Sequence, residues 1–225
     1  MSLVRVFISS PNDVRPERLI AEKIVARLDR EFSSICQVIP VLWERQPLVA
    51  TCHFQDIDNI PPPREADIVV VVLWARLGRF LPPDKFLGAM TKRQVTGTEW
   101  EFEDAYQARE KTDLMVYRKM APCLSVPAGC DEEEWFHQKH LLADFFARWL
   151  ENADGTAKGG YHKFDGPAEF EDMLYLHLRE KVLKAIPRPP STPLAQRLAV
   201  PWPAKFRARA RPDLFRPLPG PLPVA

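Results

Sequence analysis

The sequence predicts an α/β fold in which a mostly parallel sheet of four to five strands lies between two layers of helices. Short apolar runs alternate along the chain with longer amphipathic segments, which is the order expected of parallel strands joined by right-handed crossover helices. The run from Asp67 to Ala75 is almost continuously apolar, as suits a central strand covered on both faces. With 225 residues, 46% of them hydrophobic, the chain can bury one such domain.

The N-terminal part begins with a buried strand, expected at Leu3 to Ser9. A polar Ser-Ser-Pro-Asn-Asp turn follows, and Asp13 is a reasonable N-cap for a helix that has Pro16 in its first turn. The second strand is expected at Ile35 to Trp43, near an edge of the sheet because Pro40 cannot donate to a neighbouring strand. The helix between these strands buries one stripe, formed by Ile20, Ile24, Val25, Leu28 and Phe32.

The central strand is followed by a long loop from Arg76 to Thr96, and loops of this length in compact domains are usually functional or disordered. A helix from Thr98 to Lys111 comes next, with Thr98 as its expected cap. A short helix is also expected before the central strand, at Phe54 to Ile60. The remaining elements are a strand at Asp113 to Tyr117, a helix at Asp131 to Asn152, an edge strand at Tyr161 to Phe164 and a helix at Pro167 to Ile186.

Composition divides the chain into an α/β domain at residues 1–186 and a Pro/Arg-rich tail at residues 187–225. Eleven of the 39 tail residues are proline and apolar periodicity is absent, so the tail is expected to be disordered or polyproline-like. It is interpreted either as a linker to a further domain or as an aberrant C-terminus. Few aromatic residues stand between its arginines, so any binding of nucleic acid there would be weak and sensitive to salt.

Charge and cysteine content argue against several classes of protein. Lys and Arg total 31 and Asp and Glu total 30, so no overall charge attracts nucleic acid or an acidic membrane. Scattered cysteines and the lack of a signal peptide predict a cytoplasmic protein with reduced thiols, and Ile68 to Ala75 is too short to span a membrane. The spacing of Cys123, Cys130, His137 and His140 does not match a zinc site, and no Gly-rich dinucleotide or Walker loop occurs.

Polar residues lie directly after the first strand and again at the start of the helix that follows the central strand. Ser9 and Ser10 end the first strand, and Glu101 stands one turn into that helix, whereas Glu99 is expected to point elsewhere. Neighbouring parallel strands end at the same edge of a sheet, so a carboxylate facing this serine turn can bind a ribose or stabilise a cationic sugar transition state. We predict Glu101 as catalytic and, as binding residues, Ser9, Ser10, Asp13, Trp74 and Glu99.

These residues also have structural interpretations. Serine, asparagine and aspartate after a strand can simply close a turn and cap a helix. The helix dipole favours glutamate near a helix start, so Glu99 and Glu101 can belong to a solvated face. Trp43 and Trp74 end two strands, where an aromatic ring either stacks on a base or belongs to the core. The sequence leaves these alternatives open.

Three blocks of the sequence together resemble one family. They are Phe7-Ile-Ser-Ser-Pro-Asn-Asp-Val14 with Glu17-Arg18, Ala66-Asp-Ile-Val-Val-Val-Val-Leu-Trp-Ala-Arg-Leu-Gly78, and Gly97-Thr-Glu-Trp-Glu-Phe-Glu-Asp-Ala105. They are similar to the TIR-like domain at the N-terminus of bacterial and animal NACHT or WD-repeat proteins, which resemble signalling ATPases of innate immunity and phage defence. The resemblance implies a three-layer flavodoxin/TIR-like fold and, as partner, either a second copy of the domain or a NACHT ATPase.

The wider relatives of this family imply chemistry at the same helix. The nucleoside deoxyribosyltransferase pattern Gly-Thr-x-x-Glu fits Gly97 to Glu101, and the TIR pattern of Glu followed four residues later by Ala fits Glu101 and Ala105. Both patterns assign the catalytic role to Glu101. TIR domains that cleave NAD also have a Trp four residues before this glutamate, where the present chain has Gly97.

Two functions therefore stand side by side. The first, slightly favoured because many TIR relatives are inactive adaptors, is a self-associating signalling or defence module whose surface carries the function. The second is an N-glycosidase that acts on NAD or another nucleotide through Glu101, with NAD as substrate. We expect the orientation of Glu101 to discriminate between them, because a cleft shared with Ser9 favours the enzyme.

Overall fold

The computed structural model describes residues 2–42, 61–123, 126 and 131–186. Within these residues five strands form one parallel sheet in the order β2-β1-β3-β4-β5, which is the doubly wound, flavodoxin-like order. The predicted α/β fold is confirmed. The strands are β1 Ser2–Ser9, β2 Cys36–Val41, β3 Ile68–Leu73, β4 Asp113–Lys119 and β5 His162–Phe164.

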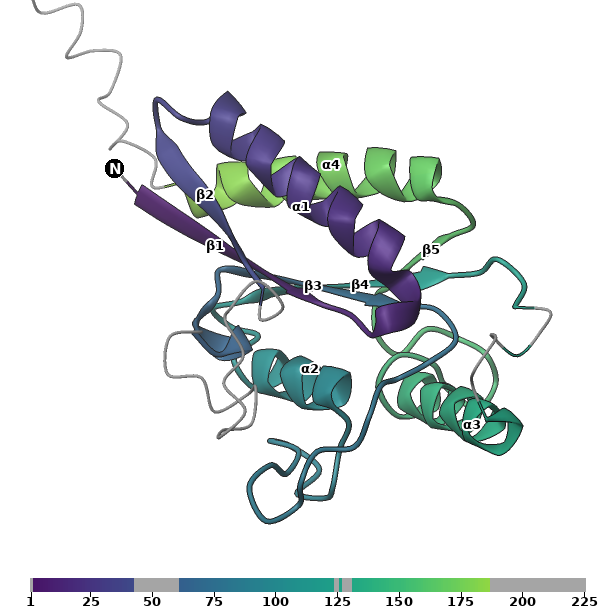
Figure 1. The fold of residues 1–225 in the computed structure, drawn as a ribbon. Coiled ribbons are helices and arrows are strands. Elements are labelled where there is room, and N and C mark those ends of the chain that lie inside the picture. The colour runs from purple at the N-terminus through teal and green to yellow at the C-terminus, as the bar shows by residue number, and fades with distance from the viewer. Residues whose placement is uncertain (1, 43–60, 124–125, 127–130, 187–225) are drawn as a thin grey trace, which may run out of the picture. The chain divides into compact units, whose positions relative to one another are not determined.

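Helices cover both faces of the sheet (Figure 1), with α1 and α4 on one face and α2 and α3 on the other. Short 3-10 turns, η1 at Asn12–Val14 and η4 at Pro63–Glu65, precede α1 and β3. Within the described residues, the expected strands and helices agree with the observed ones to within a few residues. The helices are α1 Arg15–Glu31, α2 Gly97–Gln107, α3 Glu132–Trp149 and α4 Pro167–Ala185.

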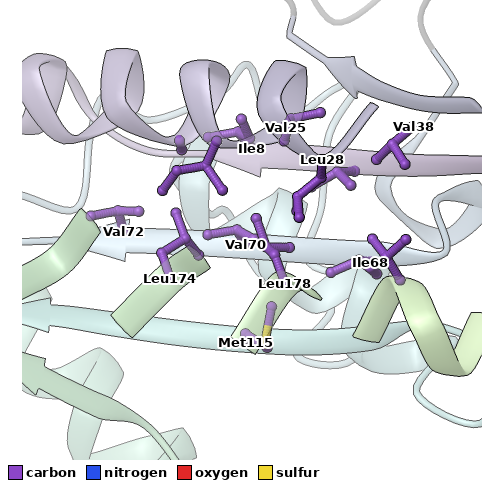
Figure 2. Close-up of a cluster of buried hydrophobic side chains, with 14 of the residues drawn as sticks. Ile8, Val25, Leu28, Val38, Ile68, Val70, Val72, Met115, Leu174 and Leu178 are labelled. Atoms are coloured by element: carbon purple, nitrogen blue, oxygen red, sulfur yellow. The ribbon is translucent and has the colours of Figure 1, made fainter. Parts of the chain in front are cut away.

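The central strand β3 divides the core into two clusters, because successive side chains of a strand point to opposite faces. All six residues of β3 are buried. Val70 belongs to the cluster under α1 and α4, and Figure 2 shows it with Val25 and Leu28 of α1 and with Leu174 and Leu178 of α4. The alternate β3 residues pack under α2 and α3. Burial of β3 on both faces thus explains the continuous apolar run in the sequence, as expected.

The starts of two helices differ from the sequence prediction. Asp13 does not cap α1, because the chain first makes the η1 turn and α1 then begins without a side-chain cap. The cap of α2 is Thr96 rather than Thr98, and Thr96 Oγ1 accepts a hydrogen bond from the Glu99 N–H at 3.3 Å. The helix therefore starts earlier than predicted. Pro40 does lie in an edge strand, β2, as expected.

The long loop after β3 is docked on α2 by a buried carboxylate. Glu103 is fully buried and accepts hydrogen bonds from the Met90 N–H at 2.7 Å and from the N–H and Oγ1 of Thr91 at 2.9 and 2.7 Å. Gly88 packs so closely that a Cβ there would lie 2.4 Å from Glu103 Oε2. This loop is therefore anchored to the helix that carries Glu101.

Some predicted features lie outside the described residues, namely the short helix at Phe54 to Ile60, Trp43, Cys130 and the tail at 187–225. Among the described helices, none has both the length and the apolar content needed to cross a membrane.

Candidate active site

A pocket of about 320 Å³ lies at the carboxyl edge of the sheet, beside the ends of β1 and β3. This is the point where the strand order reverses, and ligands of doubly wound sheets bind in the crevice there. Three segments supply its walls, namely the turn after β1, the loop after β3 and the first turn of α2. The lining residues are Ser10, Pro11, Asn12, Arg76, Gly78, Arg79, Gly97, Thr98 and Glu101.

The carboxylate of Glu101 lines this pocket and is held by the serine that ends β1. Ser9 Oγ donates a hydrogen bond to Glu101 Oε2 at 2.5 Å, although the two residues are 92 positions apart in the sequence. Ser9 is fully buried and Glu101 is only 5% exposed. A short O–H···O⁻ bond of this kind is a charge-assisted one. The structure thus joins the two segments that the sequence predicts to meet, and Glu101 lies in a cleft beside the serine turn.

A buried arginine fixes the backbone of the serine turn. Arg18 of α1 donates from Nε to Ser10 Oγ at 2.7 Å and from Nη2 to the carbonyl oxygens of Ser10 and Pro11 at 2.7 and 3.0 Å. Arg18 is only 6% exposed. Its planar fork suits several acceptors in one plane. Arg18 therefore sets the position of the turn from which Ser10 reaches the pocket wall. Sequence reasoning does not assign this role to Arg18.

Asp13 connects the two loops that form the pocket instead of capping α1. Its Oδ2 accepts a hydrogen bond from the Ala75 N–H at 3.0 Å, directly after β3. Burial raises the pKa of the Asp13 carboxyl, while the bond from Ala75 and the charge of Arg76 act in the opposite direction. Its Oδ1 is buried and has no hydrogen-bond partner among the described residues. Asp13 itself is not among the residues that line the pocket.

Two arginines of the loop after β3 give the pocket its positive charge. Arg76 is half-buried and Arg79 is exposed, and neither forms an ion pair with any residue in the described part of the chain. The Arg79 carbonyl accepts a hydrogen bond from the Gly97 N–H at 3.1 Å, which ties the loop to the start of α2. Cations without carboxylate partners at a pocket wall favour an anionic ligand. Sequence reasoning did not identify either residue.

The amide of Gln138 in α3 holds this loop in place. Its Oε1 accepts hydrogen bonds from the N–H groups of Leu77 and Gly78, both at 3.0 Å, and its Nε2 donates to the Gly78 carbonyl at 2.9 Å. Gly78 adopts a positive φ of 105°, which a residue with a Cβ rarely tolerates. The sequence carries one signal for this role, since Gln138 is a polar residue between Trp135 and Leu142 on the buried stripe of α3.

Two other predicted binding residues, Glu99 and Trp74, bond to groups outside the pocket. Glu99 is buried, and its Oε1 accepts from Arg93 at 2.6 Å and Arg148 at 2.7 Å, so this carboxylate anchors α2 to its surroundings. Trp74 donates from Nε1 to the Ala121 carbonyl at 2.8 Å. The Lys119 ammonium lies 4.5 Å from the centre of the Trp74 ring. Neither Glu99 nor Trp74 lines the pocket.

The described residues contain no group of three or more His, Cys, Asp or Glu side chains arranged to hold a metal ion. The sequence of the whole chain matches no protein-family model and no curated protein. The candidate site therefore rests on its own geometry, which comprises a carboxylate oriented by a serine, two arginines and a pocket at the switch point of a parallel sheet.

Proposed function

We propose that the chain is an N-glycosidase that cleaves NAD or a related nucleotide, with Glu101 as the catalytic carboxylate. One observation carries the proposal. The Glu101 carboxylate lines a pocket at the carboxyl edge of the sheet and receives the Ser9 hydroxyl hydrogen bond at 2.5 Å. A carboxylate with a purely capping role would not need this long-range contact.

The chemistry follows from the charge that develops when an N-glycosidic bond breaks. The transition state at the ribose resembles an oxocarbenium ion, and a fixed carboxylate beside it either stabilises the positive charge or attacks C1 as a nucleophile. The hydrogen bond from Ser9 engages Oε2 of Glu101 and so fixes the orientation of this carboxylate, one turn into α2. Ser10 lines the same pocket, and we propose that its hydroxyl, which accepts from Arg18, donates to a ribose oxygen.

The two arginines favour a substrate that carries phosphate. Arg76 and Arg79 line the same pocket as Glu101, and a guanidinium binds a phosphate through two parallel hydrogen bonds. A pocket of about 320 Å³ is at the small end of ligand sites, so it suits one nucleotide unit rather than a whole dinucleotide. For NAD, the adenylate half would then extend beyond the pocket.

The test is release of base from candidate substrates by the purified full-length chain. NAD and a set of 5′-mononucleotides are incubated with the protein at high concentration, and nicotinamide or free base is measured by chromatography. We expect Glu101→Gln, which retains an acceptor for Ser9, to lower the rate at least about 100-fold, the usual scale for loss of a catalytic acid or base. Glu133→Gln, which changes an exposed carboxylate in the first turn of α3, is the matched control and should leave the rate unchanged.

Two outcomes would contradict the proposal. One is the absence of base release from every substrate by a folded protein, also after forced oligomerisation. The other is a Glu101→Gln variant as active as the unmodified chain. The self-associating signalling or defence module, its homotypic or NACHT ATPase partner and the cytoplasmic location stay predictions, and no contact among the described residues specifically favours them over the enzyme.

A further inference from the structure

We propose that a second site, at the opposite edge of the sheet, binds a small aromatic anion the size of a mononucleotide. The site is a groove of about 740 Å³ between the C-terminal ends of α2 and α3, and we name it the α2–α3 groove. The residues that carry the argument are Tyr106, Arg109, Arg148, Trp149 and Lys158.

The groove is separate from the candidate active site. Its floor includes Asp113 and Leu114, the first residues of β4, and therefore lies at the amino edge of the sheet, whereas Glu101 lies at the carboxyl edge. The two pockets share no lining residue. In volume the groove falls well within the range of sites for drug-sized ligands and cofactors.

Aromatic rings form one wall of the groove. Tyr106 and Trp149 are half-buried, with ring centres 5.1 Å apart and planes inclined by 54°. The buried ring of Phe102, which also lines the groove, lies 5.4 Å from the Trp149 ring between centres. Partly exposed rings that are rigidly packed against one another offer a surface on which a flat aromatic ligand can stack.

The charges around the groove favour an anion. Arg109, Arg148 and Lys158 line it, and the carboxylate in the lining, Asp113, is paired with Lys181. Arg148 is itself paired with the buried Glu99, so Arg109 and Lys158 supply the positive charge available to a ligand. Arg109 is exposed and its guanidinium carbon lies 5.0 Å from the centre of the Tyr106 ring, so its charge is next to the aromatic wall. A ligand with a phosphate or sulfonate beside an aromatic ring would satisfy both features.

A buried donor in the groove lacks an acceptor. Trp149 Nε1 is buried and has no hydrogen-bond partner among the described residues. Buried indole N–H groups almost always find a partner, so an unsatisfied one calls for a physical explanation. Trp149 lines the groove, but its Nε1 is shielded from solvent, so a ligand acceptor reaches this donor only when the indole ring turns. Size, aromatic wall and positive charge thus point to the same class of ligand.

The test uses AMP as probe and the Trp149 indole as local reporter. Full-length Glu101→Gln protein, in which the proposed chemistry is blocked, is labelled with ¹⁵N-tryptophan, and Trp149→Phe identifies the Trp149 indole signal. We expect AMP to shift this signal in a saturable way, and Arg109→Gln, at an exposed position, to weaken the affinity at least about fivefold. Lys139→Gln, which removes a cation elsewhere on α3, and Arg79→Gln in the candidate active site should leave the response unchanged.

Three results would overturn the proposal. The first is a Trp149 signal that does not move at about 1 mM AMP, the concentration that half-saturates a site with a binding free energy of about −4 kcal/mol. The second is an Arg109→Gln variant that binds AMP as tightly as the parent protein. The third is that adenosine, which lacks the phosphate, binds as tightly as AMP. Because the assay measures binding in a protein without the catalytic carboxylate, it is independent of whether the glycosidase activity is found.

Discussion

Replacing Gln138 by methionine should destabilise the domain through the loop that carries Arg76 and Arg79. Methionine preserves the length and approximate volume of the side chain but cannot hydrogen-bond to the backbone. The N–H groups of Leu77 and Gly78 and the carbonyl of Gly78 would then lose the partner that now binds them at 2.9–3.0 Å.

The magnitude follows from counting these groups. Each hydrogen bond lost in a buried setting costs about 1 kcal/mol, so three give about 3 kcal/mol, and the half-buried Gly78 can recover part of this from water. For a domain of this size, 1 kcal/mol shifts Tm by about 2–4 °C, which gives a fall of about 6–12 °C. Urea unfolding should show a lower midpoint with an unchanged slope, as expected for a loss of native stability.

The assay is thermal and urea unfolding of the full chain, followed by circular dichroism. Gln107→Met, at an exposed position near the end of α2, is the matched control and should change Tm little. A Gln138→Met variant whose Tm falls by less than about 2 °C would refute the reasoning, because the three backbone groups would then have found other partners at little cost.

Two further perturbations probe other parts of the domain. Gly88→Ala places a Cβ 2.4 Å from Glu103 Oε2, so we expect faster tryptic cleavage within the loop after β3, whereas Gly160→Ala meets nothing within 4 Å and should not change the cleavage. Burial lowers the pKa of His162 and His177 below the usual 6.5, with His177 lowering that of His162 further. Their contribution to stability is therefore complete above about pH 6.5 and is lost as the pH falls through the lowered values. The urea midpoint should drop between pH 7.5 and pH 5.5. A His162→Asn, His177→Asn double variant whose midpoint does not change with pH would confirm that these two histidines cause the drop. The same pH dependence in the double variant as in the parent protein would contradict this explanation.

The sequence predicted the strands, helices and parallel sheet because apolar periodicity records which faces are buried, and it predicted the meeting of Ser9 and Glu101 because parallel strands end at a common edge. It did not predict that Asp13 binds the Ala75 N–H, because a capping role and a long-range role use the same residue type. Arg76 and Arg79 were missed because their positions depend on how a long loop folds back, and local sequence says little about that. Only Gln138 has a signal in the sequence, because it is a polar residue on the apolar stripe of α3.

The pairing of Ser9 with Glu101 links the candidate active site to the assembly of the sheet. The two residues are separated by 92 positions and come together only when β1 and β3 are aligned and α2 has crossed back over them. Bringing distant parts of a chain together costs loop-closure entropy, so contacts of this kind slow folding. A partly folded chain in which β1 and β3 are not yet aligned would therefore lack the Ser9–Glu101 contact even where its helices have formed. Any activity of this protein should consequently report on the integrity of the entire sheet.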